Sequence, residues 1–203
     1  MKLKFNFRSL VADRNALFKK ILLLSLGLFI AQMGTALMYR SLIGSSPMAT
    51  AVDGISTMLS ISKGASNIVL NTIFLIVAFI VNRKSIGIGT IIAVVQFGLF
   101  LDIWLAIIPE MVIDQMSIRI MLNILGTFFS AMGIAFYIQF NIGMGPLELM
   151  VDSIHLKSGL DYRWSRYIFD GLLLLLGILF RGVFGLGTIL NLVLMGYFLQ
   201  RFI

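Results

Sequence analysis

Two stretches of this chain read almost alike: IGSSPMATAVDGIS at residues 43–56 and IGMGPLELMVDSIH at residues 142–155. The shared residues keep the same order at a constant offset of 99 positions, and they are Ile43, Gly44, Pro47, Val52, Asp53 and Ile55 against Ile142, Gly143, Pro146, Val151, Asp152 and Ile154. An apolar composition alone produces scattered leucine and isoleucine matches. Aligned glycine, proline and aspartate instead indicate an internal repeat.

The repeat extends to both sides of these stretches. The preceding segments match, at the same offset, at Leu26, Gly27, Phe29, Met33, Gly34 and Ala36 against Leu125, Gly126, Phe128, Met132, Gly133 and Ala135. Further on, with one residue deleted, GIGTII at residues 87–92 meets GLGTIL at residues 185–190. We therefore expect a basic tail at residues 1–19, a first repeat at 20–108, a connecting loop at 109–119 and a second repeat at 120–203.

The composition indicates that lipid surrounds most of the chain. Hydrophobic residues make up 59% of the sequence and charged residues 12%, with a mean hydropathy of +1.00. A soluble domain has roughly 45–50% apolar and about 25% charged residues. The net charge of +7 lies at the N-terminus and between apolar runs, which is typical of a membrane protein and not of a nucleic-acid-binding one. Because the chain has no cysteine, disulfides and thiolate metal sites are excluded.

Six apolar runs are candidates for membrane-spanning helices, at residues 21–39, 68–81, 86–108, 120–140, 167–180 and 185–199. The second and fifth are short, since a span needs about 20 residues. The expected count is six, and it falls to five or four if a short run only dips into the membrane. Three spans per repeat is an odd number, and the two repeats then enter the membrane from opposite sides. The expected fold is an all-α transmembrane bundle of two inverted three-span repeats.

Basic residues set the expected orientation of the chain. The tail before the first span carries Lys2, Lys4, Arg8, Arg14, Lys19 and Lys20. Since basic residues are retained on the cytoplasmic side, we expect a multi-pass protein of the cell membrane with a cytoplasmic N-terminus.

The repeated loop predicts a short helix after the first span of each repeat. Pro47 and Pro146 suit the first helical turn, where a missing N–H group costs nothing. Ser46 can cap the first of these helices, and Gly145 takes the equivalent place in the second. Each helix is roughly 20 Å long at about 1.5 Å per residue, which is too short to cross a membrane.

Two interpretations of these Pro-headed helices stay open. A helix that re-enters the membrane presents free N–H groups and the positive end of its dipole at membrane depth, where they suit an anion or a carboxylate. An interfacial helix is an amphipathic elbow with Asp53 and Asp152 facing water.

Polar residues within the spans mark candidate ligand positions, because they are costly in lipid and face the bundle interior. Asn71 and Asp170 are equivalent in the repeat, although Asp170 also follows Arg166 by four residues and can form an ion pair with it. The candidate substrate-binding residues are Ser46, Pro47, Asp53, Asn71, Gly145, Pro146, Glu148, Asp152 and Asp170. The sequence contains no recognisable catalytic, metal-binding or cofactor-binding pattern, so we do not expect an enzyme.

The pattern IGxxPxxxxVDxI, followed by GxGT and a downstream GxFL, resembles the YczE/YyaS/YitT type of bacterial membrane protein over residues 20–203. In that family the loop commonly continues Pro-Trp-Asp, whereas this chain has Met48–Ala49 and Leu147–Glu148 after its prolines. The resemblance implies a protein of the bacterial cytoplasmic membrane.

The architecture favours a small transporter-like permease for an unidentified small molecule. One alternative is the substrate-binding membrane component of a multi-subunit transporter, and another is a membrane accessory or scaffold protein without transport activity. The expected partners are the lipid bilayer and a second copy of the chain or another membrane subunit.

Overall fold

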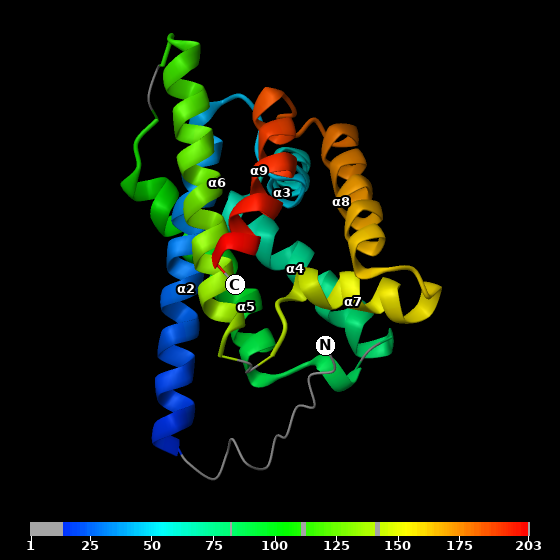
Figure 1. Cartoon of the computed structure of the whole chain (residues 1–203). Helices are drawn as coiled ribbons and strands as arrows, with labels where there is room; N and C mark the ends of the chain where they lie inside the picture. Colours follow the sequence, from blue (N-terminus) through cyan, green and yellow to red (C-terminus); the bar gives the residue numbers. More distant parts are fainter. Residues whose placement is uncertain (1–13, 82, 111–112, 141–142, 203) are drawn as a thin grey trace.

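The computed structural model describes residues 14–81, 83–110, 113–140 and 143–202. These residues form eight α-helices and one 3-10 turn and contain no strand, which confirms the expected all-α class (Figure 1). The elements are α2 (Arg14–Ser41), α3 (Pro47–Leu59), α4 (Lys63–Val81), η1 (Arg83–Ser85), α5 (Ile88–Ile107), α6 (Met116–Ile138), α7 (Pro146–Ser158), α8 (Tyr162–Leu179) and α9 (Leu186–Phe202). Lys2, Lys4 and Arg8 lie outside the described residues, and the cytoplasmic N-terminus stays a prediction.

Four helices are long and apolar enough to cross a membrane: Asn15–Ser41, Lys63–Val81, Ile88–Ile107 and Met116–Ile138. The fifth and sixth expected spans correspond to α8 and α9. Helix α8 has 18 residues but carries Arg163, Arg166 and Asp170, while α9 has 17 residues. Length and composition therefore confirm four of the six expected spans, and the other two stay predictions.

Helices α2 and α6 lie side by side and run in opposite directions (Figure 1). Glycines bring the two backbones together. A Cβ atom added at Gly27 would lie 3.0 Å from the Gly133 carbonyl oxygen, and one added at Gly34 would overlap the Gly126 carbonyl. Small residues at a helix interface permit this approach in membrane proteins, so these four glycines allow the two helices to pack closely.

Each short helix packs against the second expected span of the other repeat: α3 lies on α8, and α7 lies on α4. Between these four helices lies an apolar core of Ala51, Val52, Ile55, Leu70, Phe74, Val151, Phe169 and Leu173. The rings of Phe74 and Phe169 meet edge to face with centroids 5.2 Å apart. The short helices are thus integrated into the protein interior.

Helix α3 is mostly buried, which corrects part of the elbow interpretation. Ser46 caps it by accepting a hydrogen bond from the Ala49 N–H at 3.2 Å, with Pro47 in the first turn. The expectation that Asp53 faces water is wrong, because its Oδ1 pairs with Lys63 and its Oδ2 accepts a hydrogen bond from the Val183 N–H at 2.8 Å. The start of α4 and the connection between α8 and α9 cover this carboxylate.

Candidate functional site

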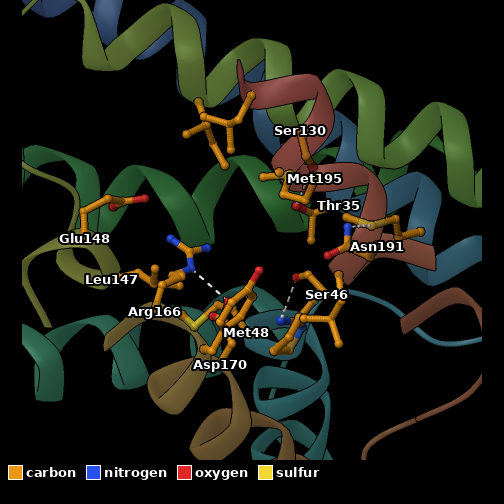
Figure 2. A pocket seen from close by; sticks show the side chains of 18 of the residues that line it. Thr35, Ser46, Met48, Ser130, Leu147, Glu148, Arg166, Asp170, Asn191 and Met195 are labelled. Carbon is orange, nitrogen blue, oxygen red and sulfur yellow. Dashed lines mark hydrogen bonds and ion pairs between the residues drawn. The ribbon is translucent and has the colours of Figure 1, made fainter. Parts of the chain in front are cut away.

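A cavity of about 390 Å³ lies between the helices, and each of the eight described α-helices contributes to its lining. Figure 2 shows Glu148 and Arg166 on one side of this cavity and Ser46 and Asn191 on another. Small-molecule sites have volumes of roughly 300–1,000 Å³. The cavity is therefore large enough for a small solute.

The first turns of both short helices reach this cavity. Ser46 and Met48 line it at the start of α3, and Glu148 lines it in the first turn of α7 (Figure 2). Gly145 precedes α7 in an extended conformation, and a Cβ atom there would lie 2.6 Å from the Tyr137 hydroxyl oxygen. A side chain at this position would displace the ends of the Tyr137 and Glu148 side chains.

Glu148 is a carboxylate without a cationic partner among the described residues. Its Oε2 accepts a hydrogen bond from the Tyr137 hydroxyl at 3.2 Å. The three ion pairs in the described ranges involve other acidic residues. The start of α7 favours a negative charge at this position through the helix dipole. Glu148 shares the cavity lining with the cations Arg163 and Arg166, but no ion pair joins it to either of them.

Arg166 and Asp170 form a second charged group on the cavity wall. Arg166 Nε donates to Asp170 Oδ2 at 2.9 Å, which confirms the ion pair that the spacing of four residues allowed. Figure 2 shows the Arg166 guanidinium directed into the space between the labelled side chains. The pair has no net charge, and the terminal guanidinium nitrogens of Arg166 point toward the cavity.

Amide side chains supply part of the remaining polar lining, which also includes Arg163, Tyr162 and Tyr167. Asn71 Nδ2 donates to the Asn67 carbonyl at 2.9 Å, and Asn191 Nδ2 donates to Thr127 Oγ1 at 3.1 Å. Gln32 is only 4% exposed, and its Oε1 has no hydrogen-bond partner in the described part of the chain. Because the protein engages the two asparagine nitrogens, the amide oxygens are the groups left for a ligand.

Five of the nine candidate residues from the sequence line the cavity: Ser46, Pro47, Asn71, Glu148 and Asp170. Gly145 and Pro146 are buried at the start of α7 and position Glu148. Asp53 and Asp152 do not line the cavity; Asp53 lies in its ion pair with Lys63, and Asp152 is half-buried. The structure thus brings together the candidates in the first helical turns and in the spans.

Sequence reasoning missed several lining residues. Gln32 is an isolated amide in the middle of the first span, and its polarity in an apolar run was a usable signal. Thr35 and Ser130 also line the cavity, but small hydroxyl residues are common at any membrane helix interface. Arg166 was considered only as an ion-pair partner. Its place on the cavity wall depends on the packing of α8 against α3.

The model of a family of unknown function, DUF6198, matches residues 18–203. The chain belongs to DUF6198. No solved structure matches it.

The relatives of this DUF6198 chain confirm the resemblance seen in the sequence. It is 26% identical over 185 residues to the uncharacterized protein YyaS of Bacillus subtilis (strain 168), covering 90% of this chain and 92% of that protein. It is 24% identical over 183 residues to the uncharacterized membrane protein YczE of the same organism, covering 90% and 81%. An uncharacterized protein of Haemophilus influenzae is 27% identical over 188 residues, covering 93% and 85%. The chain is a multi-pass membrane protein whose apolar helices contact the lipid bilayer.

Proposed function

We propose that this chain is a small permease whose solute occupies the cavity between α3, α7 and α8. The observation that carries the proposal is a cavity with charged and amide side chains inside a protein of membrane-spanning helices. Such side chains are costly at membrane depth, and they mark solute and ion pathways. A purely structural bundle would fill the same space with apolar side chains.

The pairing of α2 with α6 supports an inverted relation between the two repeats. Gly27 lies opposite Gly133, and Gly34 lies opposite Gly126. In the repeat, Gly27 is equivalent to Gly126, and Gly34 is equivalent to Gly133, so each contact is the counterpart of the other. A twofold axis between two antiparallel helices requires such a pair of contacts. Two halves related in this way can exchange which side of a central site is open.

The loops provide a second, reciprocal contact. Gly44, with φ of +101°, lies against Thr188 of the second GxGT segment, and a Cβ atom at Gly44 would be 2.5 Å from the threonine hydroxyl oxygen. Gly143, with φ of +139°, lies in the same way against Thr90 of the first segment. Only glycine adopts such φ values readily. Each Pro-headed helix is therefore joined to the other half, and we propose that the halves move as two coupled bodies.

Cysteine accessibility tests the permease directly, since the chain has no native cysteine. Single cysteines replace Met48 and Met195 in the cavity lining, and Ala51, which is fully buried outside the cavity, is the control position. A membrane-impermeant maleimide is applied to reconstituted vesicles from each side in turn. We expect both cavity positions to react from both sides, because the two open forms interconvert, and Ala51→Cys to stay unreacted.

The other outcomes separate the alternatives. Reaction from one side only would indicate a binding component that needs a partner subunit to complete transport. Cavity positions as unreactive as Ala51→Cys would mean that no aqueous path exists, and the chain would then be an accessory or scaffold protein.

A further inference from the structure

We infer, on the basis of the proposed permease, that the solute carries a protonated amine and that Glu148 binds this group. The argument rests on three features of the cavity: a carboxylate that forms no ion pair with a described residue, amide oxygens that can accept hydrogen bonds, and an apolar wall beside them.

The charge of Glu148 is the first feature. Its carboxylate lies within the cavity lining, and its assigned hydrogen bond is the one from the neutral Tyr137 hydroxyl. Asp170 already pairs with Arg166 at 2.9 Å and lowers the ability of that guanidinium to compensate a further anion. Glu148 is half-buried, and a counter-charge stabilises a carboxylate that is partly shielded from water. A cationic group on the solute supplies it.

The hydrogen-bonding capacity of the amides is the second feature. Gln32 Oε1 is buried and unpartnered, and Asn71 and Asn191 use their amide nitrogens within the described protein. Gln32 Oε1 therefore lacks a donor among the described residues, and Asn71 and Asn191 have their amide oxygens to offer a ligand. An ammonium group has three donors and no acceptor, so it can donate to such oxygens, whereas a carboxylate in the same cavity would find its donors at Arg166.

The apolar lining is the third feature. Met48, Phe97, Leu147 and Met195 also contribute to the cavity wall. These side chains suit a hydrocarbon portion of the solute, and a small aliphatic amine fits the volume of about 390 Å³. The same ammonium chemistry occurs in a simple amine and in an amino acid. In an amino acid the solute carboxylate would lie at the terminal nitrogens of Arg166.

The test uses the purified full-length chain in lipid nanodiscs and its thermal unfolding midpoint. Four probes share a branched aliphatic skeleton and differ in their polar group: 3-methylbutylamine, leucine, 4-methylpentanoate and 3-methylbutanol, each applied at tens of millimolar. A binding solute at ten times its Kd is expected to raise Tm by about 3 °C. Glu148→Gln removes the carboxylate charge, and Glu110→Gln is the matched control because the Glu110 side chain is 92% exposed at the protein surface.

We expect stabilisation of the wild type and of Glu110→Gln by the amine, by leucine or by both, and none by the acid or the alcohol. Glu148→Gln is expected to lose this stabilisation, and Glu148→Asp to keep part of it. Stabilisation by leucine alone would identify the solute as a zwitterion.

Three results would overturn the inference. These are equal stabilisation by the alcohol or the acid, unchanged stabilisation in Glu148→Gln, and no stabilisation of the wild type by either amine-bearing probe. If Glu148→Gln does not fold, the comparison of the four probes on the wild type still shows whether the cavity prefers an amine. The cysteine experiment tests the permease proposal separately. If the cavity is open to both sides but shows no preference for amines, the inference of an ammonium group is wrong and the permease proposal stands.

Discussion

Replacing Gly34 by alanine tests whether close packing of α2 on α6 holds the protein together. The added Cβ atom would overlap the Gly126 carbonyl and the backbone and hydroxyl of Ser130. Two of these obstacles are backbone atoms, so a side-chain rotation cannot relieve the overlap and the two helices must separate. Overpacking of this kind costs about 1–3 kcal/mol.

The net effect on stability is smaller than the steric cost, because alanine is a better helix former than glycine by about 0.8–1 kcal/mol. The control variant Gly171→Ala isolates that gain, since a Cβ atom at Gly171 of α8 meets no described atom within 4 Å. We expect Gly34→Ala to be less stable than Gly171→Ala by the steric cost of about 1–3 kcal/mol, and Gly171→Ala to be as stable as the wild type or slightly more so. For a chain of this length, about 1 kcal/mol corresponds to roughly 2–4 °C in Tm.

The measurement is the thermal unfolding midpoint of both variants in the same nanodiscs, with the wild type alongside. We expect Gly34→Ala to unfold about 2–12 °C below Gly171→Ala. If it unfolds at or above the Tm of Gly171→Ala, the α2–α6 interface tolerates a methyl group. The close glycine packing, and with it one argument for the twofold relation of the repeats, would then be wrong.

Three further outcomes follow from the described contacts. Asp53→Asn leaves the charge of Lys63 without its partner and is expected to lower the free energy of unfolding by about 3 kcal/mol. In chemical denaturation, the double variant Asp53→Asn with Lys63→Met should recover part of this loss. An additive loss in the double variant would contradict the pairing. Ser46→Ala removes the cap of α3 and should cost about 1 kcal/mol, whereas Ser46→Gly should cost only a few tenths; equal losses in thermal unfolding would assign another role to the hydroxyl. Asp170→Ala leaves the Arg166 charge uncompensated beside the amine site and should weaken amine binding in calorimetry more than Asn191→Ala does; equal affinities would remove the reason for placing Asp170 at the site.

The sequence by itself determined the features that depend on residues close together along the chain. Apolar runs predicted the helices, and four of them have the length and composition of membrane spans. Pro47 and Pro146 marked the starts of two short helices, and both helices begin at those residues. These features are local, because a helix makes its backbone hydrogen bonds within its own segment and places its apolar side chains in lipid or against other helices.

Only the tertiary structure decided which polar residues share a site. Asp53 and Glu148 are both acidic residues of Pro-headed helices, and the sequence offered both as candidates. Asp53 is buried because Lys63 and the backbone N–H of Val183 cover it, whereas Glu148 lines the cavity. Gln32 reaches the same cavity from a different helix. Burial of a side chain is set by the helices that pack over it, and these come from distant parts of the chain, so the residue type and its neighbours in sequence do not specify it.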